Sequence, residues 1–262
     1  MSELVHFLEV CEAAARAGAR ELVRLQGRFK SREKGPKDLV TDADLASQHA
    51  IERTVHAAFP HHAFVGEEGS VDAAAGEVEY RWIVDPLDGT ANYVHGLRPY
   101  AVSVALARGD ELLAGVILDP THDECFSARR GGGAWCNGER LRVSDCRNLH
   151  SAMMAASFAA NVQRDSEEMR HFIEVSLECQ SLRRLGSAAL NLCYVAAGKL
   201  DAYWSTSVKS WDVAAGLLIV SEAGGVVTAA DGSALQLDRP RMAVAATTQL
   251  HAELIAVLRR VS

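Results

Sequence analysis

The chain lacks any run of uninterrupted apolar residues near the ~20 that a membrane-spanning helix needs. It also lacks a basic excess, since 27 lysines and arginines stand against 34 aspartates and glutamates, which gives a net charge of −7. A nucleic-acid-binding surface is normally basic, so this balance argues against one. The sequence begins Met-Ser-Glu-Leu-Val-His-Phe-Leu-Glu, which is acidic and amphipathic rather than like a signal peptide. We therefore expect neither a membrane nor a nucleic acid among its partners.

Cysteine pairs are missing as well. The six cysteines lie far apart and none belongs to a Cys-x-x-Cys pair: Cys11, Cys125, Cys136, Cys146, Cys179 and Cys193. In a chain of 262 residues this spacing predicts reduced, mostly buried thiols and a cytoplasmic protein. No repeat, low-complexity tract or Pro/Ser-rich linker divides the chain. We therefore expect one catalytic domain over residues 1–262, with an α+β lobe over 1–150 and an α/β lobe over 151–262.

Hydrophobic periodicity predicts a mixed α/β fold. Helices are expected over residues 4–25, 42–59, 165–180, 187–197, 212–223 and 248–260. Strands are expected over residues 63–65, 82–84, 101–107, 112–119, 124–128, 226–228 and 242–246. Residues 30–37 read as a basic, turn-rich connection and residues 70–79 as a mobile surface loop.

The most informative segment is Arg81-Trp-Ile-Val-Asp-Pro-Leu-Asp-Gly-Thr-Ala-Asn-Tyr-Val-His-Gly96. A hydrophobic run ends there in Asp85 and Asp88, and Gly89-Thr90 follows, where a helix could begin. Carboxylates are hard oxygen ligands for Mg²⁺, and the N–H groups of a helix start suit a phosphate. Two like charges about 4 Å apart repel by roughly 4 kcal/mol at an effective dielectric near 20, so gathered acids call for a cation. The alternative is an ordinary Asp-rich turn after a strand.

Three further positions have the same chemical character. Glu67 and Glu68 directly follow a predicted strand, and Asp212 stands at the start of an apolar helix, where it could simply cap that helix. Ser187 likewise opens a helix of small residues and could be its N-cap. With Asp85, Asp88 and the Gly89-Thr90 step, these acids supply the parts of a phosphatase that uses two or more Mg²⁺ ions.

Three blocks of the sequence, in the same order, resemble the inositol monophosphatase family. They are Gly66-Glu67-Glu68, then Trp82-Ile-Val-Asp85-Pro-Leu-Asp88-Gly-Thr90-x-Asn92-x-x-His95, then Trp211-Asp212-x-Ala-x-Gly216 followed by Glu222-Ala-Gly-Gly225. The resemblance runs from about residue 4 to 258. It implies a layered α-β-α-β-α sandwich of the inositol monophosphatase and fructose-1,6-bisphosphatase type. It also implies two or three Mg²⁺ ions, sensitivity to lithium and a homodimer.

The resemblance also implies roles for single residues. The metal ligands would be Glu67, Asp85, the main-chain carbonyl of Leu87, Asp88 and Asp212. The catalytic residues would be Glu67, Thr90 and Asp44, of which Thr90 would orient or deprotonate the attacking water with Asp44 behind it. Lys34 matches a family lysine near the active-site loop.

Substrate contacts implied in the same way are Asp88, Gly89, Thr90, Gly186, Ser187, Ala188 and Ser205. The backbone N–H groups of Gly89 and Thr90 would meet the phosphate. Ser205 is a departure, because inositol-specific members place a glutamate seven residues before the aspartate that Asp212 matches. A charged hydrogen bond contributes about 1.5–3 kcal/mol, so the preferred alcohol is open. Lys209 fits either a solvated lysine or a contact to an acidic substrate group.

These observations predict a Mg²⁺-dependent phosphomonoesterase (EC 3.1.3.25-like) that hydrolyses inositol monophosphate or a similar small polyol phosphate. The alternatives are histidinol phosphate or another sugar or nucleotide phosphate as substrate, or a non-catalytic metal- or anion-binding regulator. Leu87-Asp88-Gly89-Thr90 also resembles the signature of haloacid-dehalogenase-like phosphatases. Those enzymes need a nucleophilic aspartate two residues before the second one, where this chain has Pro86.

Overall fold

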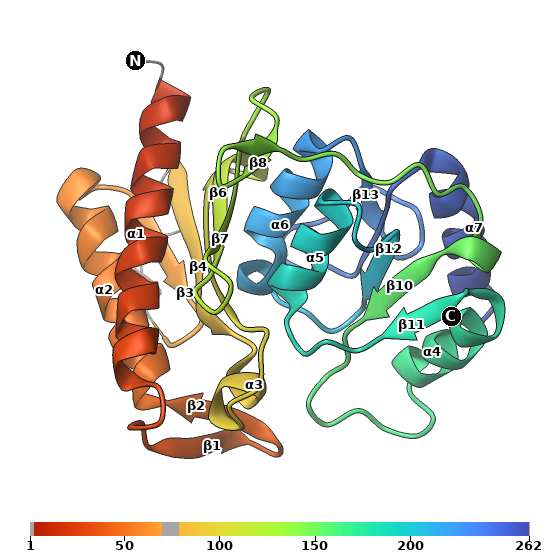
Figure 1. Cartoon of the computed structure of the whole chain (residues 1–262), viewed down its shortest axis with the longest axis horizontal. Helices are drawn as coiled ribbons and strands as arrows, with labels where there is room; N and C mark the ends of the chain where they lie inside the picture. The colour runs from red at the N-terminus through yellow and green to blue at the C-terminus, as the bar shows by residue number, and fades with distance from the viewer. Residues whose placement is uncertain (1–2, 70–78, 262) are drawn as a thin grey trace.

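The computed structural model describes residues 3–69 and 79–261, so the loop expected over 70–79 lies outside the described residues except for Glu79. The helices are α1 (Glu3–Leu25), α2 (Asp42–Ala58), α3 (Thr90–Val94), α4 (Glu167–Glu178), α5 (Ala188–Ala196), α6 (Ser210–Glu222) and α7 (Thr248–Arg259). Figure 1 shows five layers: α1 with α2, a larger sheet, α5 with α6, a smaller sheet, and α4 with α7. The predicted mixed α/β sandwich is confirmed.

The larger sheet contains the strands around the aspartate motif. In the described residues its order is β3-β4-β5-β6-β7-β8-β9. The strands are β3 (Ala63–Gly66), β4 (Tyr80–Asp88), β5 (Ala101–Arg108), β6 (Glu111–Asp119), β7 (Glu124–Arg129), β8 (Ala134–Cys136) and β9 (Glu139–Arg140). β3 runs parallel to β4, and the β4–β5 register shifts between Asp85 and Asp88. Such an irregularity redirects side chains, and here it falls around Pro86, which has no N–H to give to the ladder.

The smaller sheet has the order β11-β10-β12-β14-β13 within the described part of the chain. Its strands are β10 (Met153–Ala156), β11 (Ser181–Arg183), β12 (Ala202–Ser205), β13 (Val226–Ala229) and β14 (Met242–Ala245). The last two strands were predicted, but β10, β11 and β12 were not. They are only three or four residues long. So short a segment shows too little alternation to reveal a strand.

The prediction of a turn-rich connection over residues 30–37 is also wrong. Instead of a plain connection, β1 (Ser31–Gly35) and β2 (Asp38–Thr41) form an antiparallel hairpin. Exposed polar residues fill most of β1, so the segment has no buried face to signal a strand. The hairpin carries Lys34 and leads directly into Thr41, which caps α2 together with Asp44. The helix predicted over residues 42–59 is confirmed by α2.

Helices α5 and α6 lie between the two sheets and bury apolar residues against both. One hydrophobic core joins α5 and α6 to β-strands of each sheet, a second lies under α1 and α2, and a third lies under α4 and α7. The approach is closest where Gly115 of β6 faces Ala215 of α6. No helix among residues 3–69 and 79–261 has the length and apolar character to cross a membrane.

Replacing Gly115 with alanine tests this close approach. An added Cβ would lie 2.9 Å from Ala215 Cα and 3.1 Å from Ala215 Cβ. Because backbone cannot move aside cheaply, we expect Gly115→Ala to lower the free energy of unfolding by about 1–3 kcal/mol, measured by urea denaturation. At Gly35 the nearest atom would be Asp38 Cβ at 3.9 Å. Gly35→Ala is therefore the matched control, and equal losses in the two variants would contradict the argument.

Candidate metal and phosphate site

The end of β4 brings the central carboxylates together. Asp85 and Asp88 are 2% and 8% exposed, and the N–H of Leu87 donates to Asp85 Oδ1 at 2.9 Å. Glu67 follows β3 beside them, where its N–H donates to the carbonyl of Val84. The carboxyl groups of Glu67 and Asp85 are close enough for the charge of Glu67 to raise the pKa of Asp85. Residues far apart in the sequence thus meet because β3 and β4 are parallel neighbours.

Asp88 is anchored to the central helix layer. Its carboxylate accepts hydrogen bonds from the Ser187 hydroxyl and from the N–H groups of Ala188 at 3.2 Å and Ala189 at 2.7 Å. Ser187 is fully buried and also caps α5 by accepting from the N–H of Leu190. The Ser187 hydroxyl thus donates to Asp88 and accepts from Leu190, which orients Asp88. The contact of Ser187 with the substrate stays a prediction.

Thr90 and Asp44 lie together as the sequence predicts. The Thr90 hydroxyl is 3.2 Å from Asp44 Oδ1 and 3.1 Å from the carbonyl oxygen of Leu87. The other Asp44 oxygen accepts from the N–H and the hydroxyl of Thr41, at 2.8 and 2.6 Å. Burial raises the pKa of Asp44 to about 6 despite these bonds. The carboxylate is therefore fixed in place and able to take a proton near neutral pH.

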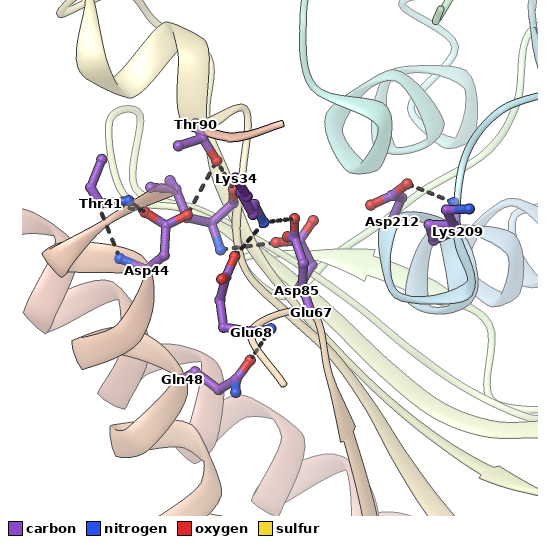
Figure 2. A network of polar contacts seen from close by, with 11 residues as sticks. Lys34, Thr41, Asp44, Gln48, Glu67, Glu68, Asp85, Thr90, Lys209 and Asp212 are labelled. Carbon is purple, nitrogen blue, oxygen red and sulfur yellow. Dashed lines mark hydrogen bonds and ion pairs between the residues drawn. The ribbon is translucent and has the colours of Figure 1, made fainter. Parts of the chain in front are cut away.

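Lys34 reaches the carboxylates from the β1–β2 hairpin. Figure 2 shows its ammonium between Glu67 and Glu68, where it donates at 2.6 and 2.5 Å. Burial alone would lower the pKa of Lys34, but the charges and hydrogen bonds of the two glutamates raise it above its ordinary value. The side-chain oxygen of Gln48 in turn accepts from the N–H of Glu68 at 2.9 Å. This contact of Gln48 was not predicted from the sequence.

Asp212 enters from the second half of the chain, at the start of α6. Its carboxylate accepts from the N–H of Lys209 at 2.7 Å, so the alternative of a helix cap is also correct. Figure 2 shows it across from the group around Lys34 and Glu67. Asp212 keeps some surface open to the cavity, yet protein atoms surround its carboxylate, and this burial raises its pKa to about 8.

The charges of neighbouring carboxylates shift each other's pKa values. Burial raises the pKa of Asp85 well above its ordinary value, and the charges of Glu67, Asp88 and Asp212 raise it further. Burial also raises the pKa of Glu67, and it raises that of Asp88 to about 6. Gathering these acids is unfavourable without positive charge, and Lys34 supplies only one unit of it. The four acids from distant parts of the chain therefore form a single electrostatic unit.

This donor set suits a hard divalent cation, because it consists of carboxylate and carbonyl oxygens. Within the described residues, no three acidic, histidine or cysteine side chains already converge around a point that could hold an ion. The reason lies in their present partners: Asp88 is bonded to α5, Asp212 to the Lys209 N–H and Glu67 to Lys34. The residues fit Mg²⁺ in chemistry, and an ion on Glu67 has to compete with Lys34 for its oxygens.

The carboxylates open into a cavity of about 740 Å³. That volume lies within the roughly 300–1,000 Å³ typical of small-molecule sites. Gly186 and Ala188 line it as predicted, beside Asp88 and Asp212. Several other residues that line the cavity were not predicted. They come from the segments after β10 and β11 and before α6: Ser157, Phe158, Asn161, Arg184 and Ser207. Those segments follow strands that the sequence did not reveal.

Ser205 is another predicted substrate contact, and it stays a prediction. It is 1% exposed and does not belong to the residues that line the cavity. Its hydroxyl donates to the carbonyl of Ser157 at 3.2 Å and accepts from the N–H of Ser207 at 3.4 Å. A serine on β12 is occupied by its neighbours, so the predicted direct substrate contact of Ser205 finds no support in its packing.

Gly89 precedes the short helix α3 with a φ of 93°, a left-handed conformation that favours glycine. A Cβ there would lie 3.2 Å from the Pro99 carbonyl oxygen and 3.3 Å from that of Gly186. Asn92 holds the same two segments together, because its amide donates to the carbonyls of Pro99 and Leu185. The phosphate contact of Gly89 and Thr90 stays a prediction.

An α-β-α-β-α sandwich with buried carboxylates at the ends of two strands and at the start of one helix has the character of a phosphomonoesterase scaffold. The sequence profile of the inositol monophosphatase family matches residues 3–262, and the chain belongs to this family. Members of the family are in general Mg²⁺-dependent.

Known proteins with similar sequences carry two kinds of name. The chain is 40% identical over 232 residues to the fructose-1,6-bisphosphatase/inositol-1-monophosphatase of Aquifex aeolicus, covering 87% of each protein. It is 42% identical over 205 residues to the Nus factor SuhB of Pseudomonas aeruginosa, covering 77% of this chain and 76% of that one. The solved inositol monophosphatase of Anabaena superposes with a TM-score of 0.89 at 32% identity, over 100% of this chain and 98% of that one.

The stability of the metal-free protein should fall as pH rises, and bound Mg²⁺ should oppose this fall. The pKa values of Asp88 and Asp212 are raised in the folded state to about 6 and about 8. A raised folded pKa stabilises the protein at low pH, and this contribution is lost as pH rises through those values. In EDTA we expect the Tm to fall between roughly pH 5.5 and 8.5, whereas excess Mg²⁺ should raise it most at the upper end.

Differential scanning calorimetry measures this prediction. Asp212→Asn removes one of the raised carboxyl groups, so it should flatten the fall of Tm in EDTA. A Tm that is level across this pH range in EDTA, or a Mg²⁺ effect that is larger at low pH, would contradict the assignment.

Proposed function

We propose that the protein is a Mg²⁺-dependent phosphatase that hydrolyses inositol monophosphate or a similar small polyol phosphate. The observation that carries the proposal is the electrostatic coupling of Asp85 to Glu67, Asp88 and Asp212 beside one cavity. Family membership supports the reaction class, and the names of relatives support the substrate class. Phosphate-monoester hydrolysis is among the slowest uncatalysed reactions, which explains the need for so much concentrated charge.

In this proposal Glu67, Asp85, the Leu87 carbonyl, Asp88 and Asp212 hold two or three Mg²⁺ ions. Bound Mg²⁺ supplies positive charge for the phosphoryl oxygens and makes water more acidic. The protein then has to keep its own ligands in place. Hydrogen bonds from α5 hold Asp88, and the Lys209 N–H holds Asp212.

Thr90 and Asp44 form the proton path. The Thr90 hydroxyl holds the attacking water and passes its proton toward Asp44, whose raised pKa of about 6 suits it to receive one. The water oxygen attacks phosphorus, the bond from phosphorus to the alcohol oxygen breaks, and the leaving oxygen takes a proton from solvent. Asp44 then returns its proton to solvent, so the products are the alcohol and inorganic phosphate. The backbone N–H groups of Gly89 and Thr90 are the proposed phosphate contacts.

We propose Gly186 and Ala188 as contacts for the alcohol, since both line the cavity. Position 205 holds a serine that does not line the cavity, where inositol-specific members of the family have a glutamate. The site therefore has no glutamate at this position to bind two ring hydroxyls. Histidinol phosphate and other sugar or nucleotide phosphates therefore stay in the comparison. We also propose a cytoplasmic, lithium-sensitive homodimer; all six cysteines are free thiols, in keeping with a reducing compartment.

A regulatory role is the second candidate, and the name Nus factor SuhB of the Pseudomonas relative favours it. The retained set of acids and the Thr90–Asp44 contact favour catalysis, because a pure regulator has no need for them. The two functions are compatible in one protein.

Phosphate release tests the proposed reaction. With inositol 1-phosphate and Mg²⁺ we expect hydrolysis that EDTA abolishes and that Asp85→Asn lowers on the order of 100-fold or more, because the variant removes a negative ligand. Asp123→Asn is the matched control, since Asp123 is an exposed aspartate at a turn with a φ of 54°. Full activity in Asp85→Asn or in EDTA would overturn the mechanism. A panel with histidinol phosphate, ranked by kcat/KM, identifies the substrate.

The proton path predicts a difference between two substitutions of Thr90. Thr90→Ser keeps a hydroxyl near Asp44 and should stay within about ten-fold of the wild type, whereas Thr90→Val should lose about 100-fold or more in kcat. Steady-state assays at saturating Mg²⁺ measure both. If the two variants lose the same activity, the hydroxyl has no part in the reaction.

A further inference from the structure

The cavity has a second wall whose chemistry the hydrolysis of a phosphate does not require. Arg184 follows β11 and Lys209 precedes α6, and both line the cavity that holds Asp88 and Asp212. Both residues are exposed. The cavity is therefore lined both by carboxylates that suit a metal and by two cations, of which Lys209 lies beside Asp212.

Neither cation forms an ion pair among the described residues, although the charge of Lys209 lowers the pKa of nearby Asp212. Across the described chain, Arg16, Arg24, Arg108 and Arg260 each form an ion pair with a glutamate, whereas no carboxylate pairs with the side chains of Arg184 or Lys209 there. The Arg184 guanidinium lies instead over the Phe158 ring, 5.4 Å from its centre. Stacking fixes the plane of a guanidinium and leaves the N–H groups at its edge for an anion.

The rest of this wall is neutral. Ser157, Asn161 and Ser207 line it with hydroxyl and amide groups. Tyr203 donates to the Ser157 hydroxyl at 2.8 Å, which fixes that group. The position of the family glutamate holds Ser205, so no acid from β12 offsets the two cations. Once metal ions occupy the carboxylates, the cations are left facing the cavity with unbalanced charge.

We propose that Arg184 and Lys209 bind a second anionic group on the alcohol part of the substrate. The preferred substrates are then phosphomonoesters that carry another phosphate or a carboxylate, rather than a neutral polyol phosphate. This inference rests on the proposed phosphatase function and narrows its substrate class. Arginine suits either anion, because its planar fork binds two oxygens at once.

Matched pairs of substrates test the proposal. Fructose 1,6-bisphosphate and fructose 1-phosphate differ by one phosphate, and 3-phosphoglycerate and glycerol 3-phosphate differ by a carboxylate. We expect kcat/KM to favour the doubly anionic member of at least one pair, and the pair that responds identifies the second anion. Arg184→Gln and Lys209→Gln should each lower that preference about ten-fold. Arg183→Gln is the control, because exposed Arg183 binds the Ser181 hydroxyl and the Leu182 carbonyl outside the cavity.

A binding measurement on a slow variant separates this inference from the reaction. In Thr90→Val with saturating Mg²⁺, the doubly anionic compound should raise the Tm more than its partner does, and adding Arg184→Gln should remove that difference. If the wild type hydrolyses no phosphomonoester while this difference in Tm is retained, the proposed function is wrong and the anion site is still supported. Equal kcat/KM values and equal Tm shifts within both pairs, or an equal loss of preference in Arg183→Gln, would overturn the anion site.

Discussion

Repulsion among buried carboxylates is the constraint on which the rest of this structure depends. Burial raises the pKa values of Glu67, Asp85, Asp88 and Asp212, and the charges of neighbouring carboxylates raise them further, because the fold holds these acids in one region with little water. Parallel β3 and β4 bring the first two together, while the starts of α5 and α6 hold the others. The fold tolerates this arrangement because its layers are well packed, and a divalent cation is the natural relief. The same strain thus links stability, metal affinity and chemistry.

Much of the fold could be predicted from local patterns. The helices that became α1, α2 and α7 show apolar periodicity, and a capping box of Thr41 and Asp44 fixes the start of α2. The acids were identifiable because each follows an apolar segment or opens an apolar helix, where a charge has no packing reason to be. Local patterns show where a helix or strand ends, because the length of the element and its capping residues determine this. They therefore show which side chains lie at those ends.

The remainder depends on contacts between distant residues, which no local pattern reports. Ser187 turned out to serve Asp88, 99 residues away, and Lys34 pairs with Glu67, 33 residues away. Strands β10 to β12 are stabilised by their neighbours in the smaller sheet rather than by their own sequence. Arg184 was overlooked for the same reason, because its place in the cavity follows from the turn after β11.

The hydrogen bonds between Asp88 and the start of α5 tie the first half of the chain to the second. A nascent chain that has emerged only as far as the larger sheet holds Glu67, Asp85 and Asp88 but has neither α5 to orient Asp88 nor Asp212 to complete the ligands. Incomplete chains and proteolytic fragments therefore lack part of this set of acids. The four carboxylates come together only after synthesis has passed residue 212, so the order of the elements along the chain decides when the site can form.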